Sequence, residues 1–345
     1  MPPPTFTPTT PLTLDGALAT ELEAAGHALT TRLWSAAALR SSPSAILAVH
    51  RSYFNAGAKI ATTASYQASF PGLRAAGYTD GEAATLVRAS VELAREAAGP
   101  DGLVAGSVGP YGAFLADGSE YTGRYALGRE AFKDFHRERV RCLVAAGVDL
   151  LALETVPNME ECRALVELLR EEFAGVRAWL SVTVRRRREA VTGGGVAIAG
   201  EEVGAALERV VTGGSVGKEV GSEEGEEVVL SDGSNLKGVA ELVEGSEQVV
   251  AVGVNCVSQE LVVPSLRALR EGTRKPLVVY PNSGEVWDAE EKVWRGDKTG
   301  GSGLEERVEE WWREGARWIG GCCRMGPKDI AVINRVMERL QKEGK

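Results

Sequence analysis

The chain has 345 residues, of which 44% are hydrophobic and 25% charged, so it can bury a sizeable core as one α/β barrel or as two smaller domains. Its formal net charge of −9 argues against a nucleic-acid partner or an anionic membrane surface, because both attract clustered Lys and Arg. Its five cysteines, two of them adjacent, favour reduced thiols in a cytoplasmic protein over a disulfide framework.

The first segment, residues 1–11, is rich in proline and lacks the basic and apolar stretches of a secretory signal, so we expect a tail. Short apolar runs then alternate with amphipathic segments, and none of the runs approaches the roughly 20 residues of a membrane span. The runs predict strands at residues 12–14, 59–63, 103–106, 149–153, 178–183, 249–254, 277–280 and 318–320. The periodic segments predict helices at residues 44–55, 79–98, 129–146, 159–173, 258–270, 304–314 and 327–342.

This alternation predicts the fold class. The predicted strands number eight, as a parallel sheet needs to close into a (β/α)8 TIM-type barrel, here one domain over residues 12–340. A doubly wound open sheet is the structural alternative. The count of eight and the positions of the polar residues favour the barrel.

One region interrupts the rhythm. Residues 185–232 are rich in Gly, Glu and Ser, and such a composition buries too little apolar surface to offset the entropy of ordering. We therefore expect a mobile, acidic insertion in the barrel, with at most a short helical segment at residues 201–211.

Polar, charged and thiol side chains directly follow the predicted strands. They are Asp15, Ser65, Tyr66, Gln67, Ser107, Glu154, Asn255, Cys256, Asn282, Cys322 and Cys323. The C-terminal ends of barrel strands form one face, and active sites are built on that face. We therefore expect these residues to meet there and to include the substrate-binding groups.

The cysteines give the sharpest chemical signal. Cys256 follows the sixth predicted strand, whereas Cys322 and Cys323 follow the eighth. Three thiolates around one Zn2+ would leave the fourth tetrahedral position open, as in catalytic zinc sites. From the spacing alone, ordinary buried thiols or a vicinal disulfide remain the alternatives. Cys142 and Cys162 lie within predicted helices and are expected to be small core residues.

The other titratable residues narrow the chemistry. His27, His50 and His136 lie in or beside predicted helices, which argues against a histidine zinc site or a Ser-His-Asp triad. Asp15 and Glu154, by contrast, both follow strands. Together on one barrel face they would offer negative charge to an ammonium group.

Seven segments also match the motifs of one enzyme family. They are LDGALATELEAAG (14–26), TASYQASF (63–70), GSVGPYGAFLADGSEYTGRY (106–125), AGVDLLALETVPNMEE (146–161), VGVNC (252–256), VVYPNSGEVWD (278–288) and GGCCR (320–324). On these motifs the chain resembles the homocysteine S-methyltransferases, in particular the members that use S-methylmethionine or S-adenosylmethionine as methyl donor. The resemblance covers about residues 12–184 and 230–335, and it departs from the family pattern at the acidic insertion.

The resemblance implies a function and a set of roles. Zinc would be held by Cys256, Cys322 and Cys323, with the sulfur of homocysteine as its fourth ligand. The backbone near Asp15 and Gly16 would receive the substrate carboxylate, while Glu154 would hold the ammonium group. Asn255 would fix the loop geometry or bind a polar group of the substrate. Ser65, Tyr66 and Gln67 would complete the substrate-binding face.

The implied reaction fits these residues, and the rivals fit less well. A free thiol is mostly protonated at pH 7, and zinc coordination removes that proton without a general base. A betaine-using relative shares the zinc site, but the chain runs only one helix beyond Cys323. A cobalamin-dependent synthase would need further modules. A zinc-binding or thiol redox protein without transferase activity would not explain Asp15 and Glu154 on the same face.

Overall fold

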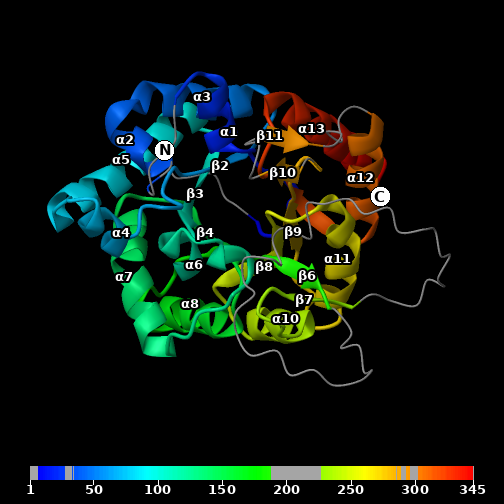
Figure 1. Cartoon of the computed structure of the whole chain (residues 1–345). Helices are drawn as coiled ribbons and strands as arrows, with labels where there is room; N and C mark the ends of the chain where they lie inside the picture. Colours follow the sequence, from blue (N-terminus) through cyan, green and yellow to red (C-terminus); the bar gives the residue numbers. More distant parts are fainter. Residues whose placement is uncertain are drawn as a thin grey trace.

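The computed structural model describes residues 7–27, 33, 35–187, 227–284, 286–288, 293–295 and 302–344. Eight parallel strands form one sheet that curls into a nearly closed barrel with helices around it (Figure 1). They are β1 (Leu12–Thr13), β2 (Ile60–Thr62), β3 (Leu103–Val108), β4 (Leu150–Val156), β5 (Ala178–Val182), β8 (Val249–Asn255), β9 (Leu277–Tyr280) and β12 (Ala316–Ile319). Their order in the sheet is β1-β12-β9-β8-β5-β4-β3-β2. The predicted single-domain (β/α)8 barrel is confirmed, and each of the eight predicted strands is present.

The seven predicted helices are also present. They are α3 (Pro43–Asn55), α5 (Asp80–Ala98), α7 (Arg129–Ala145), α8 (Met159–Glu172), α11 (Val262–Arg270), α12 (Ser302–Arg313) and α13 (Pro327–Lys342). Further helical segments are α1 (Leu18–Ala24), α2 (Ser35–Ser41), α4 (Phe70–Ala75), α6 (Tyr111–Leu115), η1 (Ser119–Tyr121), α10 (Leu236–Glu244) and η2 (Gln259–Leu261). Within the described part of the chain, none of the helices has the length and apolar character to cross a membrane.

Two apolar layers hold the barrel together. The inner layer fills the cylinder and includes Trp179, Trp318 and Tyr280, whose rings meet edge to face. The outer layer lies between the strands and the surrounding helices. At Gly253 on β8 a Cβ would lie 1.6 Å from the carbonyl oxygen of Val278, so only glycine fits this point of the wall.

The barrel closes between β1 and β2 with few contacts. The Lys59 N–H donates to the carbonyl oxygen of Thr13 at 2.8 Å. Two residues beyond the end of β1, the carboxylate of Asp15 accepts from the Thr62 N–H at 2.8 Å and from the Thr62 hydroxyl. A side-chain carboxylate therefore takes the place of a main-chain carbonyl at this joint.

Two antiparallel hairpins stand outside the barrel sheet. One pairs β6 (Val184–Arg186) with β7 (Val228–Leu230), and the other pairs β10 (Val286–Asp288) with β11 (Val293–Arg295). The first hairpin holds the two ends of the insertion expected at about 185–232, and the Arg187 N–H donates to the carbonyl oxygen of Glu227 at 2.7 Å. The rest of that insertion, including the helical segment expected at 201–211, lies outside the described residues.

Candidate functional site

Three thiols meet at the C-terminal face of the barrel. Cys256 directly follows β8, whereas Cys322 and Cys323 follow β12, and β9 lies between these two strands in the sheet. The sulfur atoms of Cys256 and Cys323 are 3.7 Å apart, and all three sulfur atoms lie within 4.8 Å of one another. The structure thus brings together the three cysteines that the sequence pattern singled out.

The local backbone explains how two consecutive residues reach one centre. The chain leaves β12 through Gly320 and Gly321, where a Cβ would lie 2.6 Å from the Cβ of Leu14 and 2.5 Å from that of Met325. These close approaches exclude larger residues. β12 ends at Ile319, so Cys322 and Cys323 are not held in strand geometry, in which successive side chains point to opposite faces. Across the centre, Cys256 has a φ of 55°, which turns its thiol toward β12.

The thiols interact electrostatically as a group. Hydrogen bonds from the other two thiols hold the pKa of Cys323 well below its ordinary value. The same kind of hydrogen bond, donated to Cys256 and Cys323, raises the pKa of Cys322. Cys142 and Cys162 lie on α7 and α8, outside the cluster.

Glu154 lies on β4 with its carboxylate in a buried, polar environment. The hydroxyl of Ser107, on the neighbouring strand β3, donates to this carboxylate. Burial raises the pKa of Glu154 to about 7, against the hydrogen bonds from Ser107 and Tyr280 that lower it. The carboxylate is thus held in place and ready to receive a cationic partner.

Asn255 connects the thiol cluster with the strand that carries Glu154. Its Oδ1 accepts from the Thr155 N–H, and its Nδ2 donates to the Thr155 hydroxyl, both at 2.8 Å. Thr155 has a φ of 60°, a strained value for a β-branched residue. The Asn255 side chain stabilises this backbone by satisfying a buried N–H.

Asp15 and Gly16 lie where expected, at the end of β1, and both are tightly packed. The Asp15 carboxylate is engaged by Thr62 at the barrel joint, and burial raises its pKa to about 8. A Cβ on Gly16 would lie 2.4 Å from the carbonyl oxygen of Met325 and 2.8 Å from the ring of Tyr53. Gly16 therefore lets the first loop pass directly beside the loop that carries the paired cysteines.

The turn after β2 places Ser65, Tyr66 and Gln67 at the same face. The Ser65 hydroxyl is fully buried and donates to the carbonyl oxygen of Ser107 at 2.7 Å, so it braces β2 against β3. Tyr66 and Gln67 are half-buried. Arg139, buried on α7, donates to the carbonyl oxygen of Tyr66 at 2.8 Å and so links this turn to α7.

Two residues at this face were not singled out by position in the sequence. Glu120 and Tyr121 lie on η1, and the Tyr121 hydroxyl is 3.6 Å from the sulfur of Cys256. Both fall within the matched segment 106–125, but they sit on a loop rather than directly after a strand. Neither residue follows a strand, so the strand-end pattern of the sequence does not indicate them.

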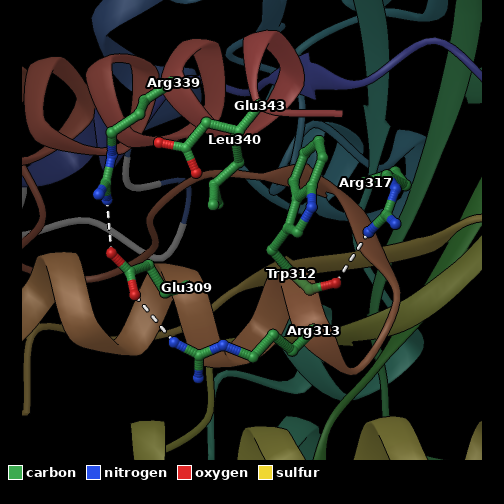
Figure 2. A pocket seen from close by; sticks show the side chains of 7 residues that line it. All are labelled: Glu309, Trp312, Arg313, Arg317, Arg339, Leu340 and Glu343. Carbon is green, nitrogen blue, oxygen red and sulfur yellow. Dashed lines mark hydrogen bonds and ion pairs between the residues drawn. The ribbon is translucent and has the colours of Figure 1, made fainter. Parts of the chain in front are cut away.

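A separate surface hollow of about 410 Å³ lies at the opposite, N-terminal end of β12. Figure 2 shows the side chains that line it, which are Glu309, Trp312, Arg313, Arg317, Arg339, Leu340 and Glu343. Arg313 and Arg339 both form ion pairs with Glu309. None of the strand-end residues lies among them. The candidate site therefore remains the thiol-bearing face.

Known proteins are similar to this chain in sequence and in structure. The family model described as homocysteine S-methyltransferase matches residues 12–337. A homocysteine S-methyltransferase of Escherichia coli is 44% identical over 331 residues, covering 93% of this chain and 94% of the relative. A selenocysteine methyltransferase of Astragalus bisulcatus is 37% identical over 352 residues, covering 94% and 92%. The crystal structure of the homocysteine methyltransferase MmuM from Escherichia coli, in its metallated form, is 41% identical, covers 95% of this chain and 96% of that chain, and has a TM-score of 0.74. The chain therefore belongs to the homocysteine S-methyltransferase family and is a methyltransferase.

Proposed function

We propose that this chain transfers a methyl group from a sulfonium donor, S-methylmethionine or S-adenosylmethionine, to the thiol of homocysteine, forming methionine. The proposed cofactor is one Zn2+ held by Cys256, Cys322 and Cys323. The bond between the methyl group and the donor sulfur breaks, its electron pair stays on the donor, and the homocysteine sulfur supplies the pair for the new bond. The cytoplasmic location expected from the unpaired thiols stays a prediction.

The spacing of the sulfur atoms carries this proposal. With zinc–sulfur bonds of about 2.3 Å, a tetrahedral site requires sulfur atoms about 3.8 Å apart. The separation of 3.7 Å between Cys256 and Cys323 meets this requirement, and the third sulfur lies within 4.8 Å. Three protein ligands leave one position for a substrate atom, as in catalytic rather than structural zinc sites. When bound, zinc would keep the substrate sulfur in its thiolate form at neutral pH.

The protein side chains around the cluster supply binding and orientation. Glu154 is proposed to hold the ammonium group of homocysteine, since its carboxylate is buried and fixed by Ser107. Asn255 fixes the backbone beside Glu154 relative to Cys256 through its two hydrogen bonds to Thr155. The backbone at Asp15 and Gly16 is proposed to receive the substrate carboxylate, and Ser65, Tyr66 and Gln67 border the same face. These contacts would align the acceptor sulfur with the methyl group.

The deciding experiment is an assay of methionine formation by purified protein loaded with zinc. Homocysteine is the acceptor, and S-methylmethionine and S-adenosylmethionine are compared side by side. We expect turnover with at least one donor and none after removal of the metal by a chelator. A parallel assay with selenocysteine tests the acceptor of the Astragalus relative. Zinc binding without methyl transfer to any acceptor would favour the non-enzymatic alternative and overturn the proposal.

A further inference from the structure

The turn η1 stands at the edge of the thiol cluster. The Tyr121 hydroxyl is 3.6 Å from the sulfur of Cys256, while the residue as a whole is 48% exposed. It is the one exposed large hydrophobic residue in the described part of the chain. Tyr121 therefore spans the boundary between the cluster and the solvent, where a second substrate would enter.

Glu120, the preceding residue, has a carboxylate oxygen that lacks a hydrogen-bond partner within the described part of the chain. Its Oε2 atom is shielded from solvent and has no hydrogen-bond partner among the described residues. In the same part of the chain no Lys, Arg or His forms an ion pair with it. Burial, followed by the negative charges of Cys256 and Asp117, raises the pKa of Glu120. A buried carboxylate oxygen without a partner is costly, and a cationic ligand would offset that cost.

The fold holds this turn in place from both ends. On one side η1 packs against α6, where a Cβ on Gly112 would lie 2.5 Å from the backbone nitrogen of Glu120. On the other side, Gly123 has a φ of 63°, and its carbonyl oxygen accepts from Nδ2 of Asn158 at 3.1 Å. The position of the carboxylate beside the cluster is therefore built into the backbone.

The charge of the whole site points to a cation. Glu120 and Glu154 both lie within electrostatic reach of Cys256, and Arg139 is the buried cation whose charge reaches Glu154. Glu154 has a proposed partner in the ammonium group of homocysteine, but Glu120 has none. The sulfonium donor brings further positive charge in its sulfonium group and in its ammonium group.

We propose that Glu120 is a specificity residue that binds the positive charge of the methyl donor, with Tyr121 as the wall between the donor and the thiol cluster. This inference rests on the proposed function, because that function supplies the cationic donor. Glu120 would strengthen donor binding without touching homocysteine. Neutral thioethers that carry no ammonium group would gain nothing from it.

The test measures donor binding separately from turnover. Calorimetric titration of the zinc-loaded protein with S-methylmethionine should show a Kd at least about tenfold weaker in Glu120→Gln than in the wild type, since a charge-assisted contact is lost. Glu120→Asp should recover part of the affinity. Zinc content and the Kd of homocysteine should stay unchanged, and the thermal midpoint should not fall, because the variant removes a buried charge without a partner. The matched control is Glu92→Gln, which removes the same charge from an exposed position on α5.

Trimethylsulfonium, which lacks an ammonium group, separates the two sources of charge. An equal loss of affinity for both compounds would assign Glu120 to the sulfonium group, and a loss confined to S-methylmethionine would assign it to the ammonium group. Unchanged donor binding in Glu120→Gln, or an equal loss of homocysteine binding, overturns the inference. Donor binding that depends on Glu120 in a protein that transfers no methyl group would contradict the proposed function alone.

Discussion

The side chain of Asn255 holds Thr155 through two hydrogen bonds of 2.8 Å, one to its N–H and one to its hydroxyl. Asn255 immediately precedes the first thiol of the cluster, and Thr155 immediately follows Glu154. The proposed metal site and the proposed ammonium site are therefore connected by one buried carboxamide, which reaches from β8 to β4 past the intervening strand β5.

Replacing Asn255 by Ala should weaken both sites at once. The buried Thr155 N–H would lose its acceptor, which costs about 1–3 kcal/mol of unfolding free energy. We expect that loss in urea denaturation, together with weaker homocysteine binding and lower zinc affinity. A variant with wild-type stability and unchanged binding would mean that the carboxamide has no part in holding the two sites.

Glu154→Gln should affect the acceptor and spare the metal. Charged hydrogen bonds contribute roughly 1.5–3 kcal/mol, so homocysteine binding should fall at least about tenfold. The control ligand is 4-mercaptobutanoate, which is homocysteine without its amino group and should bind both proteins alike. An undiminished affinity of the variant for homocysteine would remove Glu154 from the proposed role.

Metal content tests the assignment of the ligands. The purified, reduced protein should carry about one zinc per chain, as expected for a single three-thiolate site. Cys256→Ala, Cys322→Ala and Cys323→Ala should each lose zinc and activity while keeping the far-ultraviolet circular dichroism of the barrel. Cys142→Ala and Cys162→Ala serve as matched controls and should retain the metal. Retention of a full zinc equivalent by all three cluster variants would rule out the site.

His50 should make the fold sensitive to acid. It is buried on α3, neither ring nitrogen has a hydrogen-bond partner among the described residues, and burial lowers its pKa from 6.5 to about 4. The unfolded chain therefore takes up a proton near pH 6.5, whereas the folded chain does so only near pH 4. Lowering the pH through this window favours unfolding, by roughly 3 kcal/mol at pH 4.

The comparison with His50→Leu isolates this contribution from other titrating groups. The difference in unfolding free energy between the two proteins should shift by that amount, in favour of the variant, between pH 7 and pH 4. Guanidinium titrations at the two pH values provide the measurement. A constant difference would show that His50 is protonated alike in the folded and unfolded states.

The hairpin of β6 and β7 offers a test of the single-domain assignment. Arg187 and Glu227 already lie across a main-chain hydrogen bond, so an Asn-Gly turn can join them in place of residues 188–226. We propose that these residues are an insertion that the barrel does not need. The shortened protein should keep its zinc content and its thermal midpoint. Failure of the shortened chain to fold would show that residues 188–226 contribute to the domain.

Much of the barrel could be predicted because its strands are buried on both faces. Residues 249–254 and 277–280 are continuous apolar runs, and this pattern separates parallel strands from amphipathic helices. The cysteines could be placed for the same reason, since each thiol of the cluster follows such a run. The short helix α10 and the hairpins were not expected, because they lie within or beside a stretch of polar composition.

The pairing of individual side chains could not be read from the sequence. The partnership of Asp15 with Thr62 depends on how the first and second strands are staggered, and residues 47 apart in the chain carry no local signal of it. The position of Glu120 depends on a loop that folds back over α6. In the sequence, Glu120 is distinguished only because it lies in the matched segment 106–125, and that match does not specify what the side chain contacts.

The joint between β1 and β2 lacks the strand pairing that joins the other neighbouring strands of the barrel. At the other seven joints a parallel ladder of main-chain bonds joins the strands, with a register shift at three of them. Here the wall is closed by one main-chain bond from Lys59 and by a carboxylate on a rotatable side chain. Parting the strands at this point breaks only these few bonds, so widening of the barrel costs least beside Asp15. The joint that separates most easily therefore ends at the face of the barrel that carries the thiols.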